Sequence, residues 1–119
     1  MGDISRFNSK TIITAAGTRR LLVAAVAMDF NDAGDVTIPE GANYVEIRAE
    51  KADATTTTTI ARFISDGVGN PGTGVPTASD GVPIANLDFL IFGPDQIKNL
   101  QMISADANTQ KMWLTWYKV

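Results

Sequence analysis

Neither cysteine nor histidine occurs in this chain of 119 residues. Without cysteine there can be no disulfide, no thiolate metal site and no thiol nucleophile. Without histidine, the chain also lacks the usual general base at neutral pH, the usual zinc ligand and every Ser-His or Cys-His arrangement. Catalysis would have to depend on carboxylates, lysine, tyrosine or serine alone.

Positive charge and long apolar runs are also scarce. The net charge is −3, and no block of like charges occurs along the chain. A nucleic-acid-binding protein would need a basic face, so we expect neither DNA nor RNA as a partner. The longest apolar run, LLVAAVAM at residues 21–28, has about eight residues where a membrane span needs roughly twenty. We therefore expect no membrane association.

What the sequence does contain is a series of short β-branched or aromatic runs, separated by Gly, Pro, Asn and Asp. This punctuation is typical of the strands of an all-β domain. The clearest run is YVEIRAE at residues 44–50, where Val45, Ile47 and Ala49 alternate with charged residues and predict one buried face and one wet face. The other predicted strands lie at residues 21–30, 36–38, 55–65, 84–93, 97–105 and 111–119.

The last predicted strand, residues 111–119, carries large side chains on both faces. Met112, Leu114 and Trp116 alternate on one face and predict contact with the core. For the other face two interpretations are open. Either an N-terminal arm covers it, or another protein subunit binds it, since Trp and Tyr are enriched in such contacts. That second face carries Trp113, Thr115, Tyr117 and Val119.

Residues 29–40, DFNDAGDVTIPE, nearly match the calcium loop of an EF-hand. Asp29, Gly34 and Glu40 stand at the first, sixth and twelfth positions, where that loop needs an oxygen ligand, a sharp turn and a bidentate carboxylate. The fifth position, however, is Ala33, which offers no side-chain oxygen, and neither flank has a helical period. We predict a turn and no metal site, so millimolar calcium should not raise the melting temperature.

Residues 66–83, DGVGNPGTGVPTASDGVP, predict a long loop because they are rich in Gly and Pro. The segment GVGNPG formally matches a phosphate-binding loop, but no helix follows it to present backbone amides, so we expect no nucleotide cofactor.

The aspartates of the chain are scattered through predicted turns, where Asp is common. A glycosidase would need two converging carboxylates in a cleft, and we predict that the protein is not an enzyme.

The order of segments over residues 40–119 resembles small structural proteins of tailed bacteriophages. The resemblance is carried by ANYVEIRAE, IARFISDG, the loop PTASDGVPI, LDFLIFGPDQIKNLQMISADAN and the C-terminal MWLTWYKV. Within that group the chain is similar to the capsid decoration, or cement, proteins of short-tailed phages. The resemblance implies a jelly-roll β-sandwich that forms dimers or trimers and clamps the edges of neighbouring major capsid subunits.

These observations predict one antiparallel β-sandwich of the jelly-roll type over residues 21–119, preceded by an extended N-terminal arm over residues 1–20. The expected role is that of a structural virion protein on the outer surface of the capsid, with the major capsid protein and a second copy of the chain as partners. The alternative is a tail or fibre module that binds a host-surface glycan through the loop at residues 66–83. The residues predicted to bind partners are Phe7, Ile12 and Ile13 in the arm and Trp113, Thr115 and Tyr117 on the last strand.

Overall fold

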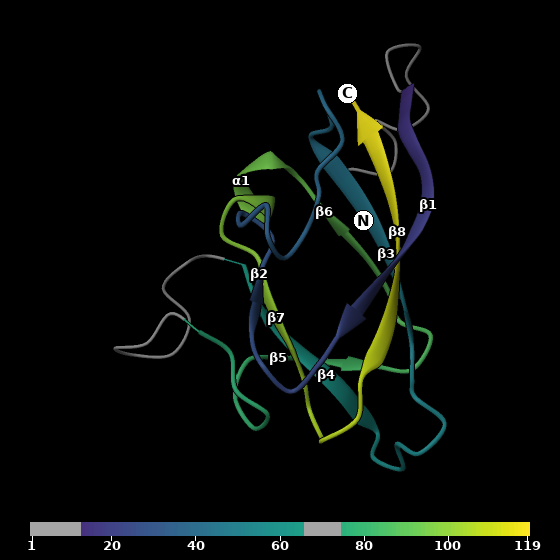
Figure 1. Cartoon of the computed structure of the whole chain (residues 1–119), viewed down its shortest axis with the longest axis vertical. Coiled ribbons are helices and arrows are strands. Elements are labelled where there is room, and N and C mark those ends of the chain that lie inside the picture. Colours follow the sequence, from purple (N-terminus) through teal and green to yellow (C-terminus); the bar gives the residue numbers. More distant parts are fainter. Residues whose placement is uncertain (1–12, 66–74) are drawn as a thin grey trace.

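The computed structural model describes residues 13–65 and 75–119, which form two antiparallel sheets of four strands each (Figure 1). The elements are β1 (Ile13–Val23), β2 (Met28–Asp29), β3 (Tyr44–Glu50), β4 (Thr59–Ile64), β5 (Val82–Ala85), β6 (Phe89–Phe92), α1 (Pro94–Ile97), β7 (Gln101–Ser104) and β8 (Gln110–Lys118). The first sheet has the order β1-β8-β3-β6 and the second the order β2-β7-β4-β5.

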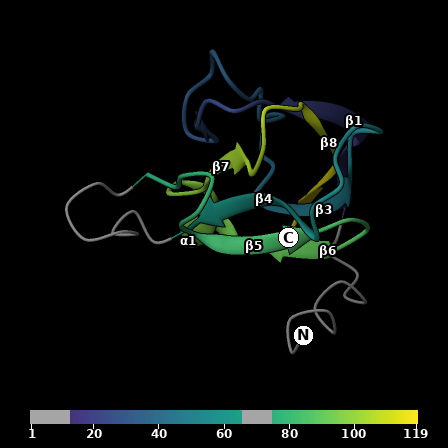
Figure 2. The same ribbon diagram turned by 90° about the horizontal axis from the view of Figure 1, so that it is seen from below.

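The strand order is that of a jelly roll. Strands pair from the two ends of the chain inward, β1 with β8, β2 with β7, β3 with β6 and β4 with β5. Further pairing of β3 with β8 and of β4 with β7 rolls this long antiparallel ribbon into two sheets. The view in Figure 2 separates β7, β4 and β5 from β1, β8, β3 and β6. The predicted all-β sandwich is therefore confirmed.

The core lies between the two sheets and follows the alternation of the sequence. In β3 the side chains of Val45, Ile47 and Ala49 are fully buried, as their spacing predicts. In β8 the inward residues are also buried, and Trp116 is only 1% exposed. Phe63 of β4 and Phe92 of β6 join the two sheets by an edge-to-face contact with ring centroids 5.1 Å apart.

One end of the sandwich is closed by a buried polar cluster around Gln110. Its Nε2 donates hydrogen bonds to Thr55 Oγ1 at 2.9 Å and to Ser104 Oγ at 3.2 Å. Its Oε1 accepts a hydrogen bond of 2.7 Å from the backbone N–H of Ala52. Throughout the described ranges, every buried side-chain nitrogen or oxygen has a hydrogen-bond partner, so the cluster is a satisfied structural network.

The N-terminal boundary of the sandwich differs from the prediction. Residues 13–20 were expected to belong to the arm, but they form the larger part of β1 and pair with β8. These residues show no apolar period because β1 is an edge strand, joined to the sheet by backbone pairing along one side. The rest of the predicted arm, with Phe7 and Ile12, lies outside the described residues.

Several strand predictions also need correction. Residues 21–30 and 84–93, each predicted as one strand, are divided between β1 and β2 and between β5 and β6. Residues 36–38 form no strand, and only Val36 of them is buried. Val82 and Pro83, expected in a loop, begin β5, which is an edge strand and can therefore accept a proline. The predicted strand at residues 97–105 is shorter because Pro94 starts α1, which ends at Ile97 before β7 begins.

No helix in the part of the chain described here has the length and apolar character needed to cross a membrane.

Candidate functional site

The side of the first sheet that faces away from the second sheet is here called the outer face. β8 lies in the interior of this sheet, between β1 and β3, so its outward side chains have neighbours on both sides. Residues that are directly opposite on paired strands share a face. One row across the four strands therefore reads Arg20, Trp113, Arg48 and Phe89, with cationic and aromatic side chains in alternation.

Contacts within this row hold its members close together. The guanidinium carbon of Arg48 lies 5.4 Å from the centroid of the Phe89 ring, within the range of a cation–π interaction. Phe89 is still 38% exposed. In the next row Thr115 lies opposite Glu46, and its hydroxyl forms a hydrogen bond of 2.8 Å with that of Thr18 on β1. The outer face thus combines exposed ring surface with charged and hydroxyl groups.

The two aromatic side chains of β8 on the outer face are fixed by the same diagonal hydrogen bond. Trp113 Nε1 donates to Glu50 Oε1 at 2.8 Å, and Tyr117 OH donates to Glu46 Oε2 at 2.7 Å. In each case the carboxylate lies two residues further along β3 than the residue directly opposite the aromatic one. Diagonal neighbours on a sheet are within reach of aromatic side chains, so these two hydrogen bonds fix the positions of both rings.

These hydrogen bonds also set the charges of the outer face. The Trp113 indole N–H, and after it the Lys111 ammonium 3.6 Å from the carboxylate, hold the pKa of Glu50 below its usual value. Burial, and after it the Glu46 carboxylate, raises the pKa of Tyr117 to about 12. At neutral pH the Glu50 carboxylate is therefore charged, and the Tyr117 phenol is a neutral donor.

A shallow depression of about 200 Å³ lies within the outer face. Because it has an aromatic ring at either side and charged groups between them, it could take a flat or apolar group whose polar atoms find partners at the margin. Its lining residues are Thr18, Glu46, Arg48, Phe89, Trp113 and Thr115.

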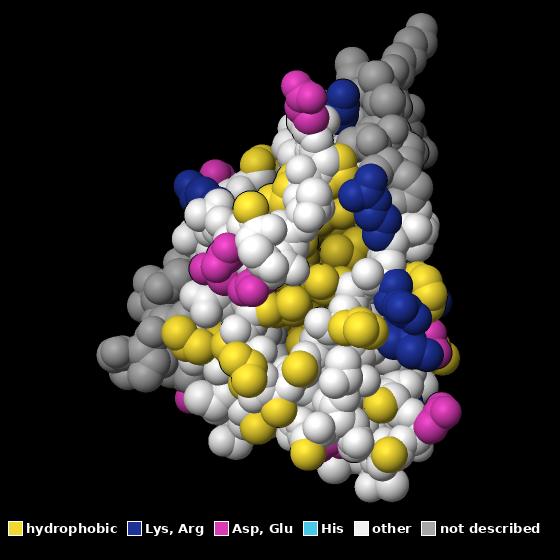
Figure 3. Space-filling view, in the orientation of Figure 1, with side chains coloured by type: hydrophobic (Ala, Val, Ile, Leu, Met, Phe, Trp, Pro, Cys, Tyr) yellow, Lys and Arg dark blue, Asp and Glu magenta, His cyan; other side chains and the backbone are white. Residues whose placement is uncertain are grey.

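A second hollow opens at the side of the sandwich, between β1 and the loop that follows β2. It measures about 260 Å³ and is here called the edge groove. Figure 3 shows a hydrophobic floor, with basic side chains along one margin and acidic side chains on the opposite one. The lining residues are Arg19, Arg20, Leu21, Asp35, Val36, Thr37, Leu114 and Trp116.

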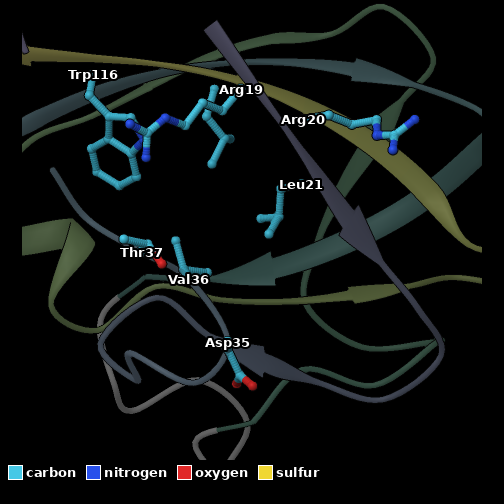
Figure 4. Close-up of a pocket in the computed structure, with 8 residues that line it drawn as sticks. Arg19, Arg20, Leu21, Asp35, Val36, Thr37 and Trp116 are labelled. Carbon is cyan, nitrogen blue, oxygen red and sulfur yellow. The ribbon is translucent and has the colours of Figure 1, made fainter. Parts of the chain in front are cut away.

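The two arginines of the edge groove lie on opposite faces of β1. Arg19 is opposite the buried Leu114 in the register, whereas Arg20 is opposite Trp113 on the outer face. In Figure 4, Arg19 extends toward Trp116, and Arg20 points the other way. An arginine can occupy the inner side of this strand because the sandwich is open here, and β2 has only two residues. Arg19 is accordingly exposed.

Half of the predicted partner-binding set can be placed on one surface. Trp113, Thr115 and Tyr117 lie together on the outer face, and all three are partly buried. Ile13 is the first residue of β1, with Lys118 as its register partner. Phe7 and Ile12 lie outside the described residues. That any of these residues binds a partner stays a prediction.

Sequence reasoning missed Arg48 and Phe89, which continue the row from Trp113 onto β3 and β6. The alternation of YVEIRAE assigns Arg48 to a wet face, but only the pairing of β3 with both β6 and β8 brings it between the two aromatic rings.

Of the loop at residues 66–83, the first part, residues 66–74, is outside the described ranges. Its later part is held by Arg62, which donates to the carbonyl oxygens of Ala78 and Gly81.

The segment 29–40 forms a turn with its own hydrogen bonds. Asp29 Oδ1 accepts from the N–H of Asn31, Asp32 Oδ1 from the N–H of Gly34, and Asp35 Oδ2 from the N–H of Asp29. The first two are the side-chain-to-backbone bonds of Asx-type turns, and the third closes the segment by joining Asp35 to Asp29. Among residues 13–65 and 75–119, no group of three acidic, His or Cys residues is arranged to hold a metal ion.

Comparisons of the chain with protein families, with curated proteins and with solved structures gave no match. The fold and the two surfaces described above are therefore the structural observations that bear on function.

Proposed function

We propose that this chain is a structural, non-enzymatic protein of a bacteriophage virion. It decorates the outer surface of the capsid by binding the major capsid protein and further copies of itself, as a dimer or a trimer. The sequence pattern over residues 40–119 supports this proposal through its resemblance to phage decoration proteins. The jelly roll is compatible with it, because viral capsid domains use this fold, although a fold does not by itself define a function.

The observation that carries the proposal is the composition of the outer face. Trp, Tyr and Arg are the residues that contribute most often to binding hot spots between proteins, and this face places Trp113, Tyr117 and Arg48 on neighbouring strands. The diagonal hydrogen bonds to Glu50 and Glu46 fix the two rings before a partner arrives. A rigid surface loses less side-chain entropy on binding, which favours affinity.

The first test is the copy number of the chain in purified particles, measured against the most abundant shell protein. A number on the order of hundreds is expected, since closed symmetry repeats one shell contact at every equivalent site. A number near six or twelve would place the chain at the neck or tail, where symmetric rings are small. Absence from the particles would contradict a role in the virion.

The second test uses variants of the outer face in a binding assay with particles that lack the chain. Trp113→Ala and Arg48→Ala should each weaken binding by about 30-fold or more if these residues are hot spots. Lys98→Ala is the matched control, because Lys98 is exposed and its ion pair with Asp95 lies outside the outer face. Equal binding by all three variants would remove the outer face from the proposal.

Deletion of residues 1–12 tests the predicted role of the arm. The deletion must stop before Ile13, because β1 starts there and its loss would remove an edge strand. We expect the shortened chain to melt cooperatively and to bind capsids much more weakly. Undiminished capsid binding would show that Phe7 and Ile12 are not partner-binding residues.

A second candidate function is recognition of a host-surface glycan by a tail or fibre protein. The shallow depression between Trp113 and Phe89 favours it, because ring surface beside Arg48 and Glu46 offers both apolar and hydrogen-bonding contacts to a sugar. Titration with oligosaccharides from the host surface, followed by tryptophan fluorescence, would test it. Saturable binding that Trp113→Ala abolishes would favour this function, above all if the copy number is small.

A further inference from the structure

The free edge of β1 is the starting point. β1 has 11 residues and pairs with β8 along one side only, since it is the terminal strand of the first sheet. Within the described residues, no backbone hydrogen bond from another segment reaches its other side. Such an edge presents N–H and C=O groups to which an extended segment of another chain can add.

The edge groove lies directly beside this edge. Its floor is formed by Leu21, Val36, Leu114 and Trp116, of which the last three are at most 4% exposed. Its volume of about 260 Å³ is large compared with the ~30 Å³ that one water molecule takes in the liquid. An added strand would direct alternate side chains toward this inner side of the sheet, so a large apolar side chain of the added segment could enter the groove.

The charges at the edge select the kind of segment. The side chains of Arg19 and Arg20 form no hydrogen bond or ion pair with any other described residue, and only their backbones pair with β8. Because they are consecutive, they place one positive charge on each face of the strand. β1 of a second copy would bring two more arginines to the same edge, and like charges on neighbouring strands are destabilising. A segment that carries carboxylates before and after its apolar residue, with at least one on each face of the added strand, would complement both arginines.

We propose that an extended acidic segment of a partner protein adds to β1 as a further strand. One large apolar side chain of the segment fills the edge groove, and its carboxylates lie beside Arg19 and Arg20. This inference rests on the proposed function, because the major capsid protein would supply the segment. The backbone edge provides affinity, and the groove and the arginines provide specificity.

The experiment places a photo-crosslinking amino acid, p-benzoylphenylalanine, at Thr37, an exposed residue that lines the groove. The full chain carrying it is bound to particles that lack the wild-type chain, illuminated and digested, and the crosslinked peptide is identified by mass spectrometry. The same amino acid at Thr57, an exposed loop residue outside the groove lining, is the control. We expect the Thr37 position alone to crosslink to a capsid-protein segment with acidic residues on both sides of a large apolar one.

Charge reversal provides the second measurement. Arg19→Glu should weaken binding to the same particles by about tenfold or more, because like charges in an interface are unfavourable. Lys98→Glu changes the net charge equally at a remote exposed site and should have no such effect. The melting temperature of each variant is measured as well, and Arg19→Gln, expected to show a smaller loss, replaces Arg19→Glu if the latter is unfolded.

The outcomes separate this inference from the function on which it rests. Crosslinks to residues 1–12, to a second copy, to a neutral or basic segment or to nothing would overturn the inference while the chain is still present on particles. Equal binding by the Arg19 and Lys98 variants would overturn it as well. If the wild-type chain does not bind particles at all, the proposed function fails, and the inference fails with it.

Discussion

Trp113 and Trp116 lie three residues apart on β8, and their replacement by alanine should have very different effects on stability. Trp116 is 1% exposed and packs in the core, so Trp116→Ala should cost about 3–5 kcal/mol through lost burial and the cavity left behind. Trp113 is only partly buried, and its indole partner Glu50 stays in contact with solvent. Trp113→Ala should cost about 1–2 kcal/mol.

The assay is urea unfolding at equilibrium, followed by circular dichroism and supported by thermal melts. A chain of this length should lose about 4 °C of melting temperature per kcal/mol. The expected losses are therefore about 12–20 °C for Trp116→Ala and about 4–8 °C for Trp113→Ala. The cost of Trp116→Ala is expected to stay below the total stability, which is about 5–15 kcal/mol for a typical domain, so both variants should fold. Equal losses for the two variants would refute the reasoning, because Trp113 would then be as well covered as Trp116, as the covering-arm interpretation of the last strand requires.

Three further predictions concern single side chains. Gln110→Leu should lower the free energy of unfolding in urea by about 2–3 kcal/mol, because it leaves buried polar partners unsatisfied. A loss below about 0.5 kcal/mol, which is the usual effect of a surface substitution, would contradict this prediction. The difference in phenolate absorbance between the wild type and Tyr117→Phe should titrate with a midpoint of about 12. Glu46→Gln should lower that midpoint. Since the folded pKa is raised, the stability that Tyr117 contributes in its neutral form should be lost as pH rises from the ordinary value of about 10 toward 12. An unshifted midpoint would contradict both the burial of Tyr117 and its contact with Glu46. Leu87 is 60% exposed and has a φ of 68°. Because asparagine adopts a positive φ more readily than leucine, Leu87→Asn should raise the free energy of unfolding by about 0.5–1 kcal/mol. A loss of stability would show that the Leu87 side chain contributes to packing.

The parts of the fold that the sequence predicts well are those where one face is buried and the other is wet. The bounds of β3 coincide with the run YVEIRAE, and the inward face of β8 is the predicted one. Residues 13–20 of β1 were missed because an edge strand is joined to the sheet through its backbone, and ITAAGTRR carries no apolar period to reveal it. Backbone pairing of this kind depends on which partner strand is available, which is a tertiary property.

The same distinction applies to the candidate sites. Alternation alone places Trp113, Thr115 and Tyr117 on one face. It cannot place Arg48 and Phe89 beside them, because their positions depend on which strands pair and in what register. The edge groove was missed for a similar reason, since it exists only because β2 stops after two residues and leaves the side of the sandwich open.

The position of β8 has a consequence for the time course of folding. Of the strands described here, β8 is synthesised last, yet it lies in the interior of the first sheet, between β1 and β3. Neither the β1–β8 nor the β3–β8 ladder can form until β8 has left the ribosome. Until then β1 has no partner in the sheet, and the apolar inner side of β3 lacks a neighbour on one side. Topologies with such distant pairings fold slowly, in milliseconds to seconds, and expose strand edges to aggregation in the meantime. The exposed, charged pair Arg19 and Arg20 at the centre of β1 would then protect the nascent chain, because charges on an unpaired edge discourage pairing with other copies.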